Sequence, residues 1–398
     1  MASQPSLLAA TAKLNNGLII PRIQLGLYMM STKEATDAVR QGLLTGYRGF
    51  DCAQMYHNER QAGKAISDFL ASSENAAGLK REDIWYTSKL ANCDESYDAV
   101  RRSVKKSVEA SGLGYIDLFL LHSPYGGKTA RLTSWKALED AVDAGEIRAA
   151  GVSNFGSAHI EELMASNPLI PPVLNQIEVH PFNTQEGIRA TCAKHNIAIE
   201  AYAPLARAER MDHPAIVNMA KKYSVTPAQI FVKWGLQHEF ITLPKSTKQK
   251  RMIENASVDG FEILEADMKE LDGLDEHLVT DCSHESLNII TTHSIPLLTH
   301  SPPPPFPFPP QYHAAAFIHQ FVRYDLQRGM KANTFQEVNL LLALHTTNMK
   351  PDMNDRNRGS TPGRIEIAIS LQAEMGLMDE TVKFMASQAN AMSQTPAQ

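Results

Sequence analysis

The 398-residue sequence has little of what marks membrane, nucleic-acid-binding or disulfide-rich proteins. No apolar run approaches the ~20 residues that a membrane-spanning helix needs. Acidic residues outnumber basic ones, 44 to 38, which does not favour nucleic acid as a partner because its binding needs a basic face. The four cysteines lie far apart, so the sequence contains neither a disulfide framework nor a CxxC motif.

The start of the chain and its cysteines predict a cytoplasmic protein. Residues 1–14 lack the charged region and the long apolar core of a signal peptide. Isolated cysteines suit a reducing compartment, and we expect Cys52 to be a small apolar residue of a strand rather than a reactive thiol. We predict no metal site, no membrane or nucleic-acid partner, and a monomer or weak dimer.

Short apolar segments alternate with helical periodicity along residues 14–278. Residues 14–24 predict a hairpin that turns at Asn16 and Gly17. Eight strands are then predicted, each followed by a helical segment, over residues 23–28, 47–53, 84–89, 115–122, 147–154, 173–179, 197–204 and 240–244. Short connections give right-handed crossovers to parallel neighbours, and eight such units close a (β/α)8 TIM barrel, an α/β fold. A doubly wound sheet is the alternative, but no GxGxxG turn follows any strand.

The C-terminal part departs from the barrel pattern and is predicted to be an atypical extension. We assign residues 1–280 to the barrel and the proline-rich residues 281–312 to a disordered linker. Residues 313–398 are predicted to form a partly helical tail, with helical periodicity at 335–345 and 364–387. Two interpretations stay open: a fused segment whose Met-rich helix binds a partner, or a poorly ordered stretch read from non-coding sequence. We favour the second.

Polar side chains follow three neighbouring strands at their carboxyl ends, where barrel active sites form. Asp51 ends the second strand and Tyr56 follows in the loop, while Lys89 and His122 end the third and fourth strands. Adjacent strands are ~4.8 Å apart, so these side chains converge. A buried ammonium favours the phenolate form of a neighbouring tyrosine, and Asp51 supplies the carboxylate that a buried lysine needs. Each residue alone is more often a structural ion pair or a surface group, but the four together predict a site that protonates a carbonyl oxygen.

Several motifs, in order and at matching intervals, resemble those of the aldo-keto reductases from about Leu14 to Leu278. They are GYRGFDCA with Glu59 (46–59), YTSK ending in Lys89, LFLLHSP around His122, GVSNF (151–155), NQIE (175–178), AYAPL (201–205) and LPKSTKQKRMIEN (243–255). The resemblance implies the family's barrel, a bound nicotinamide cofactor, and a catalytic tetrad of Asp51, Tyr56, Lys89 and His122.

The resemblance also implies which residues contact the cofactor. Ser153, Asn154 and Gln176 would hold the carboxamide, and Tyr202 would stack on the nicotinamide ring. The remaining matches to the family's cofactor-binding pattern, most of them at the adenosine end, are Leu205, Lys245, Ser246, Arg251, Glu254 and Asn255. Because the basic cluster around Lys245 and Arg251 suits a 2′-phosphate, we predict NADPH rather than NADH; a solvated helix start is the alternative.

Some positions differ from the pattern common in the family. Tyr28 stands where many members have a tryptophan, and Ser123 where an aromatic is frequent, so both are expected to line a more polar substrate pocket. Gly49 replaces a bulkier residue, and we expect looser packing there. The loop after Tyr202 is expected to cover part of the cofactor. Two interpretations stay open for Arg207, Glu209 and Arg210 in this loop: they pair as a latch, or they are solvated at the surface, which is commoner for such charges.

These observations predict an NADPH-dependent oxidoreductase that reduces small aldehydes or ketones, with Tyr56 as general acid. The second hypothesis is a regulatory or interaction module of the same fold that binds the cofactor with vestigial turnover. A metal-dependent barrel hydrolase is disfavoured, because it would need several His and Asp ligands at the strand ends.

Overall fold

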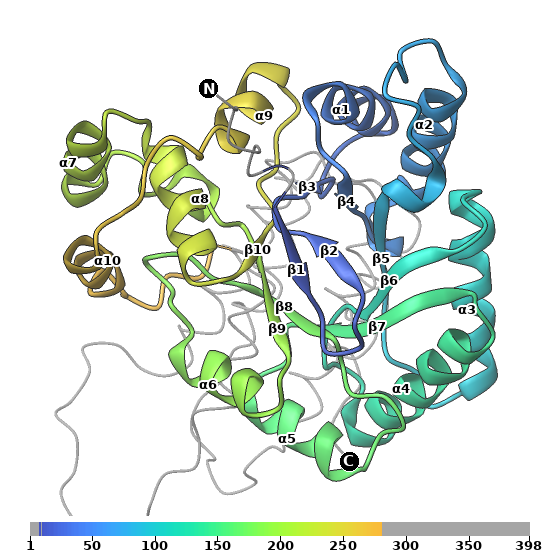
Figure 1. Cartoon of the computed structure of the whole chain (residues 1–398). Helices are drawn as coiled ribbons and strands as arrows, with labels where there is room; N and C mark the ends of the chain where they lie inside the picture. The colour runs from blue at the N-terminus through green and yellow to red at the C-terminus, as the bar shows by residue number, and fades with distance from the viewer. Residues whose placement is uncertain (1–7, 9, 281–398) are drawn as a thin grey trace, which may run out of the picture. The chain divides into compact units, whose positions relative to one another are not determined.

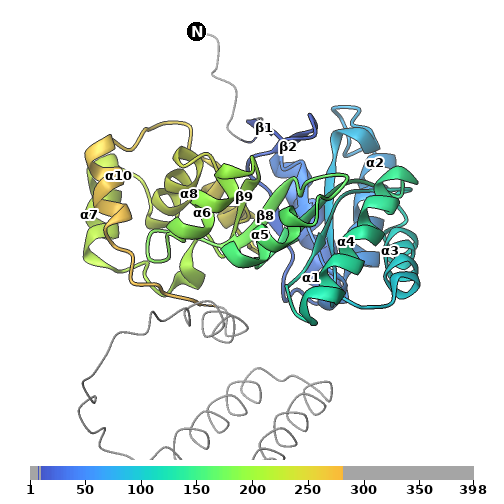
Figure 2. The ribbon, with the colours of Figure 1, turned by 90° about the horizontal axis from the view of Figure 1, so that it is seen from below.

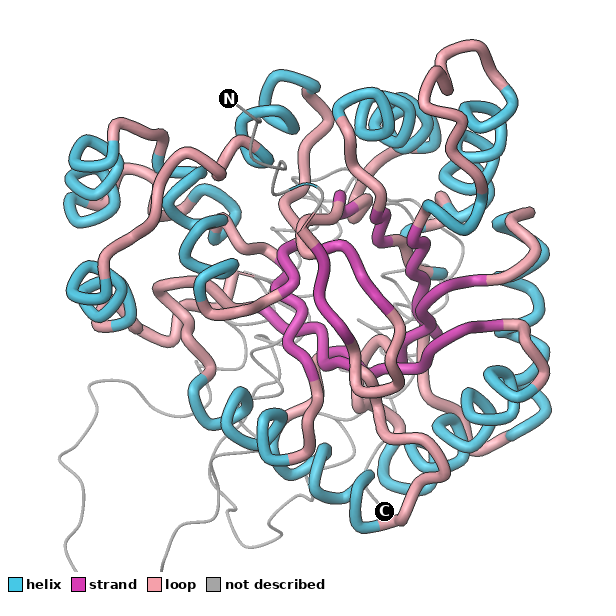
Figure 3. The backbone as a smooth tube through the Cα atoms, viewed as in Figure 1, coloured by secondary structure: helices cyan, strands magenta, loops and turns pink. Residues whose placement is uncertain are grey.

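The computed structural model describes residues 8 and 10–280, which form a barrel of eight parallel strands surrounded by helices (Figure 1). Neighbouring strands pair in chain order: β3 (Leu25–Gly26), β4 (Gly49–Asp51), β5 (Trp85–Leu90), β6 (Ile116–Leu121), β7 (Ile147–Ser153), β8 (Leu174–Glu178), β9 (Ala198–Tyr202) and β10 (Ile241–Thr242). The ring closes where the Gln24 N–H donates to the Thr242 carbonyl (2.9 Å) and the Thr242 N–H donates to that of Arg22 (2.8 Å). Figure 3 shows the strands as this ring. The predicted barrel and its eight strands are confirmed.

An N-terminal hairpin covers the amino ends of the barrel strands (Figures 1 and 2). Strands β1 (Thr11–Lys13) and β2 (Ile19–Pro21) are antiparallel, and Gly17 makes the turn with a φ of 86°. The side chains of Leu14 and Ile20 belong to an apolar layer inside the barrel, together with Trp85, Leu118, Leu120, Ala149, Val173, Leu174 and Ile241. The predicted hairpin is confirmed, and it closes the barrel floor with apolar side chains.

The helices cover the outside of the sheet: in the described part of the chain, one α-helix follows each strand from β3 to β8, and two follow each of β9 and β10. They are α1 (Thr32–Thr45), α2 (Glu59–Ala71), α3 (Tyr97–Ser111), α4 (Gly127–Asp143), α5 (Ser157–Ala165), α6 (Glu186–Lys194), α7 (Pro214–Tyr223), α8 (Pro227–Gln237), α9 (Gln249–Ala256) and α10 (Glu265–Asp272), with short 3₁₀ turns η2 (Gln54–Tyr56), η3 (Arg81–Asp83) and η4 (Ala206–Ala208). Helix α1 illustrates why they form: Ser31 and Glu34 make a reciprocal capping box at its start, and Gly46 ends it in the left-handed region. Its face of Ala35, Ala38, Val39 and Leu43 is buried.

The segment after α10 runs across the carboxyl end of β8. The N–H groups of Glu276 and Leu278 both donate to the carbonyl of Phe182, at 3.2 and 2.9 Å. The Thr280 N–H donates to the Glu178 carboxylate at 2.9 Å. This segment therefore lies beside the strand ends where the candidate site residues stand.

The expectations for the linker at 281–312 and the tail at 313–398 concern residues outside those that the structure describes. Across residues 10–280, no helix has both the length and the apolar character that crossing a membrane requires.

Candidate active site

The structure brings the four predicted catalytic residues together at the carboxyl ends of β4, β5 and β6. Asp51 is the last residue of β4, Tyr56 ends the turn η2, Lys89 lies in β5, and His122 directly follows β6. The parallel pairing of β4 with β5 and of β5 with β6 places these ends side by side. Asp51 and Lys89 are buried, whereas Tyr56 and His122 are half-buried.

The Lys89 ammonium is the centre of this group. Its Nζ donates to Asp51 Oδ1 at 2.7 Å, to the Cys52 carbonyl at 2.9 Å and to the Tyr56 hydroxyl at 3.1 Å. These three acceptors use all three N–H donors of the ammonium. Asp51 compensates the buried charge, and the third bond favours negative charge on the Tyr56 oxygen.

The rings of His122 and Tyr28 pack against the Tyr56 ring. The imidazole of His122 lies edge-on to the Tyr56 ring, with the ring centroids 5.7 Å apart. On another side the Tyr28 ring lies 5.1 Å from the Tyr56 ring, also edge-on. The Arg207 guanidinium carbon lies 5.4 Å from the centre of the Tyr28 ring. Tyr28 therefore lies beside the candidate acid, and Ser123, half-buried, directly follows His122.

The residues expected to hold a nicotinamide carboxamide lie beside the tetrad, at the ends of β7, β8 and β9. The Asn154 amide donates to the His122 carbonyl at 2.9 Å, and its Oδ1 accepts from the Tyr202 hydroxyl at 3.0 Å. The Ser153 hydroxyl donates to the Gln176 carbonyl at 2.9 Å. The Gln176 amide in turn donates to Asp51 Oδ2 at 2.9 Å. One hydrogen-bonded network thus joins the proposed catalytic and cofactor-binding residues.

The residues expected at the adenosine end lie after β10 and in α9, with Leu205 half-buried just before η4. Lys245 and Arg251 are exposed, and Ser246 and Asn255 are buried. Lys248 is the residue before α9, and its N–H donates to the Ser246 hydroxyl at 3.1 Å. Exposed cations near a helix start are available to an anionic group. Glu254, in the same helix, is half-buried.

A second buried carboxyl group, that of Glu200 in β9, lies next to the network of Gln176 and Asp51 and was not predicted from the sequence. Its Oε2 accepts from Gln176 Nε2 at 2.8 Å, and its Oε1 accepts from Gln24 Nε2 at 3.0 Å. The side chain is completely buried, and burial, together with the nearby charge of Asp51, raises the pKa of Glu200 to about 8. A glutamate in the otherwise apolar segment 197–204 is the signal that could have identified it.

The expectation of looser packing at Gly49 was wrong. A Cβ built on Gly49 would lie 2.6 Å from Oε1 and 2.7 Å from Cδ of Gln24. The Gln24 side chain therefore occupies the space that a larger residue at position 49 would fill, and it reaches Glu200 from there.

Cys52 and the loop after Tyr202 were also the subject of sequence predictions. The Cys52 thiol is completely buried and donates to Asn58 Oδ1 at 3.0 Å, and burial raises its pKa to about 12, so it is the inert apolar residue expected, although it directly follows β4 and does not lie in it. Of the two interpretations for Arg207, Glu209 and Arg210, the latch is not formed, because no ion pair among the described residues joins the three side chains. Arg210 instead pairs with Glu276 at 2.7 Å, while Arg207 lies over Tyr28.

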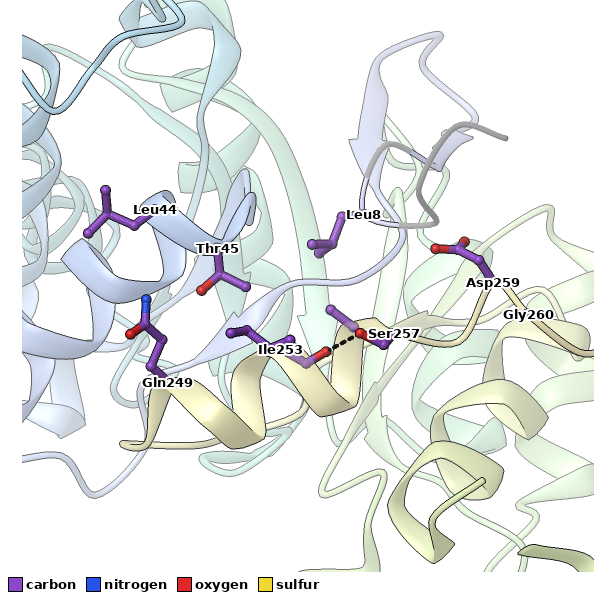
Figure 4. A pocket seen from close by; sticks show the side chains of 9 residues that line it. Leu8, Leu44, Thr45, Gln249, Ile253, Ser257, Asp259 and Gly260 are labelled. Atoms are coloured by element: carbon purple, nitrogen blue, oxygen red, sulfur yellow. Dashed lines mark hydrogen bonds between the residues drawn. The ribbon is translucent and has the colours of Figure 1, made fainter. Parts of the chain in front are cut away.

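A separate hollow of about 480 Å³ lies on the outside of the barrel between α1 and α9 (Figure 4). Its lining includes Leu8, Leu44, Gln249 and Ile253, and contains no member of the tetrad. In Figure 4 the Ser257 hydroxyl bonds to the Ile253 carbonyl, at 2.7 Å, and thus satisfies a helix end. The hollow is therefore not part of the candidate active site.

Comparisons with known proteins agree with this architecture. The profile of the Aldo/keto reductase family matches residues 22–276. An uncharacterised oxidoreductase of Schizosaccharomyces pombe is 47% identical over 275 residues, which cover 69% of this chain and 97% of that protein. Glyoxal reductase of Bacillus subtilis is 38% identical over 273 residues, covering 68% and 95% of the two chains. The aldo-keto reductase of Bombyx mori, solved in complex with NADP, superposes with a TM-score of 0.65 at 31% identity and covers 70% and 97% of the two chains.

Proposed function

Because the chain belongs to the aldo/keto reductase family of oxidoreductases, we propose that it reduces aldehydes or ketones to alcohols with NADPH. The observation that carries the proposal is the Lys89 ammonium, which is held by Asp51 and donates to the Tyr56 hydroxyl at 3.1 Å. A cytoplasmic monomer or weak dimer that acts on small carbonyl compounds is part of the same proposal.

The residues present fit a nicotinamide cofactor. Polar side chains of Ser153, Asn154 and Gln176 meet at the ends of adjacent strands, and the half-buried ring of Tyr202 lies next to them. Gln176 Nε2 donates to two carboxyl groups, so its Oε1 is left to accept from a carboxamide N–H. The exposed cations Lys245 and Arg251 suit a 2′-phosphate. When bound, NADPH supplies the hydride.

The chain's own residues then move one proton and orient the substrate. Tyr56 donates its hydroxyl proton to the carbonyl oxygen as the carbonyl carbon is reduced. Lys89 stabilises the resulting phenolate through its hydrogen bond, and Asp51 keeps Lys89 in place. His122, beside the Tyr56 ring, donates a hydrogen bond that orients the carbonyl oxygen.

The test is NADPH oxidation by the full chain with a panel of aldehydes, for wild type and Tyr56→Phe. Removal of the general acid should lower kcat by about 10²–10⁴ and leave NADPH affinity within a few-fold. Tyr97→Phe is the matched control, because the Tyr97 hydroxyl donates to Asp140 on the outer helices. Turnover in Tyr56→Phe equal to wild type would reject the assigned acid. Tight NADPH binding without turnover in wild type would favour the cofactor-binding module.

A further inference from the structure

The carboxyl group of Glu200 is linked to the ion pair of Lys89 and Asp51 by a single side-chain amide, that of Gln176. Gln176 Nε2 donates one hydrogen to Asp51 Oδ2 at 2.9 Å and the other to Glu200 Oε2 at 2.8 Å. Gln176 and Glu200 are partners in the β8–β9 ladder, and Glu200 is completely buried. The proposed mechanism assigns no role to Glu200.

The two carboxyl groups fix which way the Gln176 amide points. A turned amide would place its oxygen against Asp51, which carries the negative charge that Lys89 requires. Because both N–H donors face the carboxyl groups, Gln176 Oε1 faces away from them as an acceptor. The amide orientation therefore depends on Glu200 as well as on Asp51.

Gln24 allows Glu200 to carry a proton. Gln24 Nε2 donates to Glu200 Oε1 at 3.0 Å and to the Pro21 carbonyl at 3.3 Å, whereas its buried Oε1 lacks a partner among the described residues. Turning the Gln24 amide over exchanges its nitrogen and oxygen, and a protonated Glu200 Oε1 then donates to Gln24. Glu200 Oε2 still accepts from Gln176 in that arrangement, so the protonated form keeps the Gln176 amide in place.

The charges around Glu200 also favour the neutral form. Asp51 from β4 raises the pKa of Glu200, in addition to the larger effect of burial, while Lys89 from β5 and the Gln176 hydrogen bond lower it less. Lys89 is already paired with Asp51 at 2.7 Å. An ionised Glu200 would thus add a second negative charge to a buried ion pair that is already balanced.

We propose that Glu200 is a positioning residue: its protonated carboxyl group holds the Gln176 amide so that Oε1 faces the nicotinamide site. The inference rests on the proposed function, because it takes the cofactor-binding role of Gln176 from there. Glu200 acts through Gln176 and Asp51 and does not touch the substrate.

Two substitutions distinguish the loss of the ionisable proton of Glu200 from the loss of its hydrogen-bond acceptor. Glu200→Gln keeps a neutral acceptor for Gln176, and its own amide can donate to a turned Gln24. We expect kcat/KM and NADPH affinity within about twofold of wild type at pH 6–7. Glu200→Leu removes the acceptor, and loss of one hydrogen bond should weaken NADPH binding roughly 3- to 10-fold.

The pH profile distinguishes this role from a merely structural one. Above about pH 8 wild type gains a negative charge near Tyr56, which holds the Tyr56 proton more tightly. The alkaline decrease of reduction should therefore begin at a lower pH in Glu200→Gln, by about half to one unit. Coinciding alkaline limbs, or a Glu200→Gln variant already impaired at pH 6, would overturn the proposal.

Infrared spectroscopy detects the proton on Glu200 without an activity assay. A failure of this inference can therefore be told apart from a failure of the proposed reductase function. Wild type at pH 6 should show the carbonyl stretch of a protonated carboxylic acid that Glu200→Gln lacks, and the band should vanish as pH passes about 8. The control is Asp267→Asn, because buried Asp267 accepts from the Lys222 ammonium at 2.7 Å, which lowers the pKa of Asp267; this change should remove no such band. A wild-type spectrum identical to that of Glu200→Gln at pH 6 would refute the protonated carboxyl even if Glu200→Leu fails to fold. NADPH binding by Glu200→Leu as tight as wild type would refute the positioning role.

Discussion

The coupling between Gly49 and Gln24 can be measured as a free energy of unfolding. In Gly49→Ala the new methyl group would lie 2.6 Å from Gln24 Oε1, so the buried Gln24 side chain must move. Moving it breaks the 3.0 Å hydrogen bond to Glu200. Gln24→Ala removes the same side chain by another route, and in the double variant the methyl group of residue 49 enters vacated space.

The magnitudes follow from these contacts. Overpacking costs about 1–3 kcal/mol, and loss of a buried hydrogen bond about 1–2 kcal/mol, so Gly49→Ala should lose about 2–5 kcal/mol. Gln24→Ala should lose about 1–2 kcal/mol, and the double variant about the same, because the clash is gone. The interaction free energy between the two positions then equals the cost of Gly49→Ala alone, about 2–5 kcal/mol in favour of the double variant.

Urea unfolding of the full chain measures these values. The three tryptophans of the sequence, Trp85, Trp135 and Trp234, are all buried in the barrel, so their fluorescence follows its unfolding. Gly187→Ala is the control, because a Cβ at that position of α6 meets nothing within 4 Å and should stabilise by about 0.5–1 kcal/mol. Additivity of the Gly49 and Gln24 changes within about 0.5 kcal/mol would refute the coupling.

The other two predictions concern pH and cofactor choice. The pKa of Glu200 is about 8 in the folded protein and 4.5 ordinarily, so between these values the unfolded chain loses the proton that the folded protein keeps. The free energy of unfolding of wild type relative to Glu200→Gln is therefore greatest below about pH 4.5. It falls by up to ~1.4 kcal/mol per pH unit until about pH 8. Urea unfolding from pH 5 to 9 checks this, and a constant difference contradicts it. Arg251→Ala should weaken NADPH binding roughly tenfold and NADH binding less than twofold, because only NADPH carries the 2′-phosphate. Fluorescence titration measures the dissociation constants of both cofactors, and Arg102→Ala, at an exposed position of α3, is the control. Equal losses of affinity for NADPH and NADH would argue against Arg251 as a contact of the 2′-phosphate.

The barrel was predictable because its signals are local. Each strand is a short apolar segment followed by helical periodicity, and caps such as the one formed by Ser31 and Glu34 lie within one turn of sequence. The convergence of Asp51 and Lys89 was also predictable, since polar residues at the carboxyl ends of adjacent parallel strands must meet. The Lys89–Asp51 and Lys89–Tyr56 hydrogen bonds follow directly from that placement.

The contacts missed by the sequence analysis depend on how the barrel closes. Gln24 and Glu200 are 176 residues apart and meet because the segment before β3 pairs with β10, next to β9. Periodicity indicates that Glu200 is unusual in its strand but does not say which side chain it faces. The partner of Arg210 is likewise Glu276, 66 residues away, rather than its sequence neighbour Glu209. Local pattern therefore predicted the elements and their ends, while pairings across the ring required the structure.

The layers inside the barrel explain how a glutamate can occupy an apolar strand. The floor is apolar, from Leu14 and Ile20 to Leu120, and the ion pair of Lys89 and Asp51 lies at the carboxyl end. Glu200 is bonded toward both sides, through Gln24 from the segment that follows the floor hairpin and through Gln176 to Asp51. An ionised Glu200 would leave one uncompensated negative charge there, whereas the neutral acid preserves the balance of the ion pair and every hydrogen bond of the Gln176 amide. With its proton, Glu200 thus adds no charge beside the ion pair of Lys89 and Asp51, and Lys89 keeps its hydrogen bond to Tyr56.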